Sequence, residues 1–408
     1  MEAEYREALE NWRRLAEENP AEYGPQVAAT LHNLANLHYK TQRPAEAEAE
    51  YGEALAMYRR LAAAQPEAYE PDVATTLNNL ANLHGDTGRW AAAEAEYREA
   101  LGIRRRLAAG NPSVYEPGVA STLNNLAVLH GDMRRLAEAE SEYGEALSIY
   151  RKLAASRPDV HEADVAMTLN NLANLHGDML RRSEAESEYE EALAIRRKLA
   201  AAQPEVYEPG VATTLSNLAN LHDDMLRLSE AEAEYGEALA IRRGLAKGRP
   251  EAYEPGVATT LNNLAILHKK TQRFEKAAAE YKEALEIRRR LAEGNPEAYE
   301  PDVATTLNNL AILHRDTQRL AEAEEECMEA VEIWHRLVEE NASVYEAYMG
   351  ETLCEWALVK KVQNDQDGMR TLAGKAVGFF KRCDERTSGM YADKVRWAEG
   401  VLNGNAEE

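Results

Sequence analysis

Proline and histidine recur along this chain at one fixed interval of 46 residues. The repeating residues are Pro20, Pro66, Pro112, Pro158, Pro204, Pro250 and Pro296, together with His38, His84, His130, His176, His222, His268 and His314. A period between about 20 and 50 residues is typical of a solenoid, in which each supersecondary unit packs only against its neighbours. Such an array presents a long surface instead of one closed core, so the period favours binding over catalysis.

Composition excludes several classes of partner. The chain has 408 residues and a formal net charge of −24, which disfavours binding to nucleic-acid phosphates or to an anionic membrane surface. No apolar run approaches the roughly 18 residues of a membrane span, and the N-terminal segment lacks the features of a signal peptide. The chain has only three cysteines, Cys327, Cys354 and Cys383. This number is small and odd, so the cysteines do not indicate a disulfide framework. We therefore expect a cytoplasmic protein.

Each 46-residue unit predicts a pair of helices. In the second unit, Pro71 can open a first helix, and residues 85–88 end it. One face of this helix carries Val73, Leu77, Leu80, Ala81 and His84 at helical spacing. A second helix is expected from Trp90 to Ala109, with a basic end at Arg104–Arg106 that complements the helix dipole. A connector of the form Pro-x-x-Tyr-Glu-Pro then leads to the next unit.

The apolar and small residues of a unit resemble the tetratricopeptide repeat (TPR). The resemblance is carried by Leu77-x2-Leu80-Ala81-x2-His84, then Ala93-x3-Tyr97, then Ala100. Seven units share this pattern, although their period is longer than the usual one of about 34 residues. The long period and the Leu-Asn-Asn-Leu-Ala core are most similar to the kinesin-light-chain type. The resemblance implies an all-α protein, a right-handed TPR superhelix with its first helices on the concave face.

The pattern divides the chain into three parts. Residues 1–24 resemble the second helix of a unit with its connector, residues 25–346 hold seven tandem repeats, and residues 347–408 form a degenerate repeat with a terminal helix over Tyr391–Leu402. Terminal units of solenoids are commonly atypical. Because the first part lacks a preceding helix, we expect its open face to support a dimer or a larger complex.

The sharpest candidate site is a column of asparagines on the first helices, one residue before the second leucine of each unit. The column consists of Asn33, Asn79, Asn125, Asn171, Asn217, Asn263 and Asn309. The preceding position holds Asn78, Asn124, Asn170, Asn262 and Asn308, with His32 and Ser216 in the other two units. The column resembles the asparagine ladder in the TPR superhelix of O-linked N-acetylglucosamine transferase, which implies a peptide-binding groove. An amide both donates and accepts, so it can bind any peptide backbone. The alternative is that each Asn braces the next repeat.

Two further positions vary between units and are therefore candidates for specificity. Three residues after the column stand Asn36, Asn82, Asn174 and Asn220, but Val128, Ile266 and Ile312. Four residues further on stand Lys40, Asp86, Asp132, Asp178, Asp224, Lys270 and Asp316. This order predicts a groove that is polar and acidic in its middle and more apolar and basic toward the C-terminal end. The alternative is a solvated helix end without a ligand.

The remaining patterns argue against metal binding and catalysis. Neighbouring helices pack about 8–10 Å apart, whereas a Zn–N bond is about 2 Å long, so successive histidines of the column cannot share an ion. We expect each histidine to be a core residue with one hydrogen bond. The segment Gly368–Lys375 has one residue too many for a phosphate-binding P-loop, and His161-Glu162 lacks the second histidine of a zincin. We expect no cofactor, no metal and no enzyme activity.

The sequence therefore predicts a non-catalytic scaffold that binds an extended segment of a partner protein. The alternative is a regulatory or sensor subunit of a separate effector enzyme, in which the array flexes in response to a ligand. Neither the partner nor the pathway follows from the residues.

Overall fold

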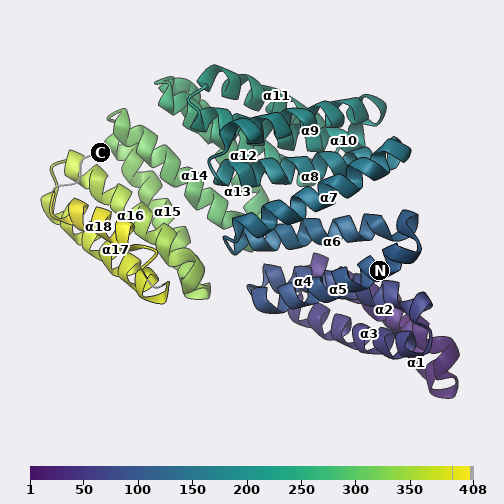
Figure 1. Cartoon of the computed structure of the whole chain (residues 1–408). Helices are drawn as coiled ribbons and strands as arrows, with labels where there is room; N and C mark the ends of the chain where they lie inside the picture. Colours follow the sequence, from purple (N-terminus) through teal and green to yellow (C-terminus); the bar gives the residue numbers. More distant parts are fainter. Residues whose placement is uncertain (388, 405–408) are drawn as a thin grey trace. The chain divides into compact units, whose positions relative to one another are not determined.

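The computed structural model describes residues 1–387 and 389–404, and within this part of the chain all regular structure is α-helical. The first helices of the units are α2 (Pro20–Lys40), α4 (Pro66–Asp86), α6 (Pro112–Asp132), α8 (Pro158–Asp178), α10 (Pro204–Asp224), α12 (Pro250–Lys270), α14 (Pro296–Asp316) and α16 (Ala342–Val362). The second helices are α1 (Glu2–Glu18), α3 (Pro44–Ala64), α5 (Trp90–Gly110), α7 (Leu136–Ser156), α9 (Arg182–Ala202), α11 (Leu228–Ala246), α13 (Phe274–Gly294), α15 (Leu320–Glu340) and α17 (Gln366–Arg386). A terminal helix, α18, spans Ala392–Leu402. The prediction of an all-α solenoid built from helix pairs is confirmed (Figure 1).

The first helices begin five residues earlier than the sequence pattern predicts. Pro66 occupies the first turn of α4, where a missing N–H has no cost, and Pro71 lies inside the same helix. Pro71 leaves only the carbonyl of Glu67, four residues back, without its helical donor. In α8 the equivalent position is Ala163, and that helix spans the same part of its repeat. The expected connector is therefore the first turn and a half of the helix.

The helices of a repeat meet through small residues. Ala81 of α4 and Ala93 of α5 are both fully buried, and Tyr97 fills the space beside them. The same cluster includes Leu126 and Leu129 of α6, so the core continues from one repeat into the next. Burying a leucine side chain contributes about 1.5–3 kcal/mol, which places much of the stability at the contacts between repeats.

The three arginines at the end of α5 serve three different contacts. Arg104, expected to be helix-end charge, instead turns into the repeat interface, where its Nη1 donates to the carbonyl oxygen of Gly118 at 2.9 Å. Arg105 donates to Glu145 of α7 at 2.7 Å, and Arg106 donates to Glu70 of α4 at 2.8 Å. The second helix of one repeat is thus tied to both helices that flank it.

A three-residue turn joins the two helices of each repeat. Its middle residue has a positive φ: +73° at Gly88, +58° at Arg134 and +59° at Leu180. The turn is closed by backbone bonds such as Arg89 N–H to the His84 carbonyl at 2.8 Å. This geometry fixes the C-terminal ends of the first helices, where the predicted specificity residues lie.

The chain divides into two compact units, Met1–Gln203 and Pro204–Glu408. In the first, α2, α4, α6 and α8 also contact one another in sequence, so these first helices form one continuous face. In the second, α17 and α18 pack on α16, and Ala398 and Val401 of α18 are fully buried. None of the helices described is both long and apolar enough to cross a bilayer.

Candidate functional site

The two asparagine rows on the first helices differ in exposure. The residues that precede the column are mostly buried: Asn78, Asn124, Asn170 and Asn262 have exposed fractions of 4–8%. The column residues themselves are half-buried at Asn79, Asn125 and Asn171, and Asn33 is exposed. The column is therefore the row that both touches the neighbouring repeat and reaches the surface.

Several column asparagines hydrogen-bond to the preceding repeat. The Nδ2 of Asn79 donates to Asn36 Oδ1 at 3.1 Å, and that of Asn125 donates to Asn78 Oδ1 at 3.5 Å. In the second compact unit, residues 204–408, Asn309 donates to Asn262 in the same way at 3.1 Å. These are the contacts of the bracing alternative, and the amide nitrogen of Asn79 also lies 3.3 Å from His32 Nε2 in the preceding repeat. Asn171 has no hydrogen-bonded partner among the residues described.

A tyrosine of the second helix orients the asparagine that follows the column. Tyr51 Oη donates to Asn36 Oδ1 at 2.6 Å. Tyr97, Tyr189 and Tyr235 make the same bond to Asn82, Asn174 and Asn220. Burial raises the pKa of Tyr51 to about 12, so the phenol remains a proton donor at neutral pH. The bond uses the amide oxygen as its acceptor and does not involve the amide N–H groups.

The charged row at the ends of the first helices is partly neutralised. Asp86 accepts a hydrogen bond from Tyr39, and Asp178 lies 3.5 Å from Arg134. In the second unit, Lys270 pairs with Asp223 at 2.6 Å. Two neighbouring cations are also ion-paired: Lys269 lies 2.8 Å from Asp316, and Arg315 lies 2.5 Å from Glu355. The basic residues of this region therefore carry little uncompensated positive charge.

A cavity of about 600 Å³ lies between α6 and α8, where several predicted residues meet. Its lining comprises Trp90, Ala127, Val128, Gly131, Asp132, Arg134, Tyr143, Asn171, Asn174, Leu175 and Asp178. Five of these side chains are candidate site residues predicted from the sequence: Val128, Asp132, Asn171, Asn174 and Asp178. The sequence pattern does not predict Trp90, Arg134 and Tyr143, which come from the flanking turns and second helices. The one available signal was Trp90, at a position that holds proline, leucine, arginine or phenylalanine in the other repeats.

Two models of the tetratricopeptide repeat match the chain. One covers residues 72–152 and 118–198, and the other covers residues 27–64, 211–246, 257–297 and 303–341. Together they span more than half of the chain. The chain belongs to the tetratricopeptide repeat family. TPR arrays are scaffolds for contacts with other proteins and are generally non-catalytic.

Solved structures extend the comparison. BtubC (BKLC) from P. vanneervenii is 29% identical, with a TM-score of 0.49, and the match covers 60% of this TPR chain and 90% of that one. A STAND (signal transduction ATPase) protein from Pyrococcus horikoshii, which has a TPR sensor, is 14% identical with a TM-score of 0.58; the match covers 94% of this chain but only 54% of that protein. The apo form of RapI is 16% identical with a TM-score of 0.45, over 70% of this chain and 97% of that one. No curated protein sequence that was compared matches the chain.

The histidine column of the TPR array is buried, and most of its members lie between two carboxylates; an exception is His314, whose Nε2 has no hydrogen-bond partner among the described residues. His176 Nδ1 is 2.8 Å from Glu188 in its own repeat, and Nε2 is 3.4 Å from Glu140 in the preceding repeat. Arg181 completes the group, 2.6 Å from Glu140. His176 was expected to make a single hydrogen bond, and it makes two contacts. The contact with Glu140 joins neighbouring repeats.

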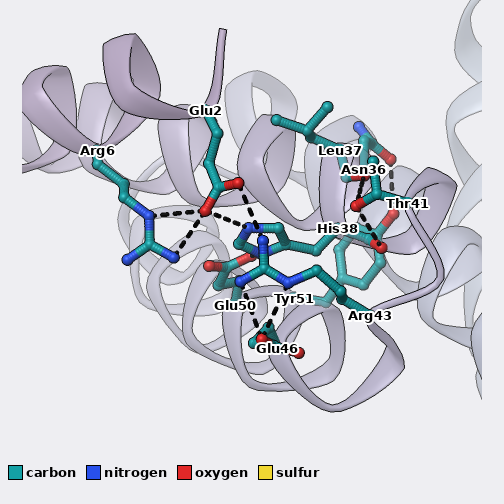
Figure 2. A network of polar contacts seen from close by, with 10 residues as sticks. All are labelled: Glu2, Arg6, Asn36, Leu37, His38, Thr41, Arg43, Glu46, Glu50 and Tyr51. Carbon is teal, nitrogen blue, oxygen red and sulfur yellow. Dashed lines mark hydrogen bonds and ion pairs between the residues drawn. The ribbon is translucent and has the colours of Figure 1, made fainter.

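Figure 2 shows the same arrangement in the first repeat, where Glu2 of α1 lies against His38, Arg6 and Arg43. The hydrogen bond from Arg43, with those from His38 and Arg6, lowers the pKa of Glu2 to about 2. Across the residues described, no group of three or more histidine, cysteine or acidic side chains is arranged to hold a metal ion. In this network, hydrogen bonds and ion pairs between partly buried side chains link neighbouring repeats.

The cysteines offer no reactive thiol. Cys327, Cys354 and Cys383 are free and buried. Burial raises the pKa of Cys354 to about 12 and raises that of Cys327 as well. A thiol is a weak nucleophile without its thiolate form, so these side chains act as small core residues.

Proposed function

We propose that this TPR array binds an extended segment of a partner protein along the face formed by its first helices. The observation that carries the proposal is the cavity between α6 and α8, whose lining contains members of the column and of both variable rows. Side chains at the same helical positions in successive repeats line one face, so a bound segment would meet a similar set of groups every repeat.

The chemistry of this face suits a peptide backbone. A backbone exposes alternating N–H and carbonyl groups, and an asparagine side chain can pair with either. Asn171 has no partner among the described residues, and Asn174 is exposed with its oxygen already bonded to Tyr189. These two amides lie three residues apart on α8 and therefore present neighbouring groups on one face.

The test is a selection of random twelve-residue peptides on the immobilised full chain, followed by titration of the selected peptides in solution. Replacing Asn171 and Asn174 together with alanine removes two hydrogen bonds, each worth about 0.5–1.5 kcal/mol. We expect affinity to fall by roughly 5- to 150-fold, with helix content unchanged. Gln65→Ala, which removes an exposed amide at the junction of α3 and α4, is the matched control and should bind as the wild type does.

Melting temperature measured on the same proteins separates a binding role of these two asparagines from a structural one. If the double variant melts earlier but its folded fraction binds the selected peptides normally, the asparagines are braces and the proposal is wrong. Equal binding by the double variant and the wild type, at equal stability, would place the peptide on another surface.

A further inference from the structure

We propose that the cavity between α6 and α8 holds a lysine or arginine side chain of the bound segment. The inference rests on the proposed peptide binding and adds a chemical preference at one point along it. The volume of the cavity, about 600 Å³, falls within the range of about 300–1,000 Å³ that is common for ligand pockets. This is enough for a long side chain with its flanking backbone.

The first argument is an exposed tryptophan in the cavity wall. Trp90 begins α5 and keeps 45% of its surface exposed, although most large apolar side chains of the repeats are buried. Val128, which is 44% exposed, lines the same cavity. Tryptophan is the aromatic residue that attracts a cation most strongly, and the methylene stem of lysine or arginine packs well on apolar groups.

The second argument is a carboxylate without a paired cation. Asp132 lines the cavity, is exposed, and forms no hydrogen bond or ion pair with any residue described. Partial burial and the negative charge of Asp86 raise its pKa, and the positive charge of Arg134 lowers it. A cation bound beside Asp132 would favour its ionised form.

The rest of the lining leaves a net negative charge. Asp178 and Arg134 are 3.5 Å apart with side chains 61% and 76% exposed, an arrangement that contributes little in water and can open readily. Two carboxylates against one guanidinium favour a cationic ligand over an anionic one. A neutral aromatic ligand would bury Asp132 without a partner, which costs free energy.

The third argument is the polar wall that α8 contributes to the cavity. Asn171 and Asn174 both line it, and Asn171 has no hydrogen-bonded partner among the described residues. The amide oxygen of Asn171 can accept a hydrogen bond from an ammonium, a guanidinium or a peptide N–H in the cavity.

The repeats themselves supply substitutions that the fold tolerates. Leucine stands at the position of Trp90 in three other repeats, as Leu136, Leu228 and Leu320, and lysine stands at the position of Asp132 in two, as Lys40 and Lys270. Trp90→Leu and Asp132→Lys therefore change the cavity without placing an unfamiliar residue in a repeat. Glu190→Lys makes the same change of charge on the second helix α9, outside the cavity, where Lys282 stands at the equivalent position of another repeat, and it is the matched control.

The experiment uses a library of random twelve-residue peptides, selected on the full chain and on each variant. The wild type and Glu190→Lys should enrich lysine or arginine at one fixed distance from the other selected residues. For one selected peptide, replacing that basic residue with norleucine should reduce affinity about 10- to 100-fold, as expected for a hydrogen bond to a charged group. Trp90→Leu should reduce affinity for the basic peptide about 2- to 5-fold.

Asp132→Lys should lose the preference for a basic residue and enrich aspartate or glutamate at that point, a gain that unfolding cannot produce. If the selected peptides bind the asparagine face but show no basic preference, this inference is wrong and the proposed function stands. A preference that Asp132→Lys leaves unchanged also overturns it, because the cation then binds elsewhere. If no peptide binds at all, both proposals fail together.

Discussion

At the scale of single residues, the buried His176 joins two carboxylates whose pKa values shift in opposite directions. Burial raises the pKa of Glu188, whose partner in the structure is His176. The hydrogen bond from Arg181 lowers the pKa of Glu140 despite partial burial. A raised folded-state pKa gives stability that is present in acid and lost as pH rises, and a lowered one does the reverse. The imidazole of His176 therefore lies between two carboxylates whose contributions to stability change with pH in opposite directions.

This opposition predicts the pH dependence of two glutamine variants. Wild-type Glu140 stabilises the fold above its unfolded pKa of about 4.3 and stops doing so as pH falls toward its lowered folded pKa. The melting temperature of Glu140→Gln should thus lie below that of the wild type at pH 7, and this difference should shrink as the pH falls below about 4.3. For Glu188→Gln, the melting temperature relative to wild type should rise between pH 4 and pH 7. Thermal unfolding followed by circular dichroism across this range measures both.

Gln retains the hydrogen bond to His176 in both variants, so a change common to the two would report on packing and not on charge. Gln203→Ala, an exposed change between helices, serves as the neutral control. Parallel pH profiles for Glu140→Gln and Glu188→Gln would contradict the assignment of opposed environments.

The histidine network also shows where residue-level prediction stops. The burial of the column follows from its helical spacing with Leu77 and Leu80, and the partner 12 residues later lies in the same repeat. The second partner of His84, Glu48, lies 36 residues earlier, in the preceding repeat. A pattern within one repeat carries no information on that contact, because it depends on how repeats stack.

At the scale of elements, the turn between the two helices of each repeat requires a left-handed backbone whatever residue occupies it. Gly88 meets this requirement without steric cost, and a side chain added there would meet no atom within 4 Å. Leu180 and Leu226 adopt the same conformation with φ of +59° and are 74% and 79% exposed. A left-handed conformation costs a non-glycine residue about 1–2 kcal/mol.

Leu180→Gly should therefore stabilise the array, and Gly88→Leu should destabilise it. Glycine loses more entropy on folding, which offsets part of the gain, so we expect about 1 kcal/mol in each direction. Urea titration of the full chain, with amide exchange in α8 and α9 as the local measure for Leu180→Gly, tests the expectation. The control Leu180→Ala removes the exposed side chain but retains a Cβ; if it stabilises as much as glycine does, the backbone argument is wrong.

The boundaries of the elements were harder to predict than their existence. Both helices of every repeat follow from apolar spacing, but the start of the first helix was placed at Pro71 instead of Pro66. Each proline alone satisfies the requirement of a first helical turn. The choice depends on whether the segment between them is helical, and Ala163 in α8 shows that the second proline is dispensable.

At the scale of the molecule, the packing within each unit is between near neighbours along the chain. One core cluster of the first unit extends from Leu101 of α5 through Leu123 of α6 to Ala192 of α9, and each of its helices touches the next. Exposed pairs such as Arg59–Glu99, 2.7 Å apart, add links between second helices but contribute little individually. The sequence predicts the rows of asparagines and variable residues on the first helices. It does not predict the cavity, which depends on the spacing between α6 and α8 and on Trp90.

Because each repeat packs only against its neighbours, a destabilising substitution should affect only the repeats close to it. Leu123 is 2% exposed, and its replacement by alanine should cost about 2–5 kcal/mol. In a solenoid this loss is felt by the altered repeat and its neighbours, because distant repeats share no contacts with it. Amide exchange in α6–α8 should accelerate by roughly 30-fold or more, while α16 and α17 keep their protection. Leu353 in α16 is also 2% exposed, and Leu353→Ala should accelerate exchange in α16 and α17 while α6–α8 keep their protection. Equal acceleration of both regions by either change would mean that the chain opens as one cooperative unit and that its two compact units are not independent.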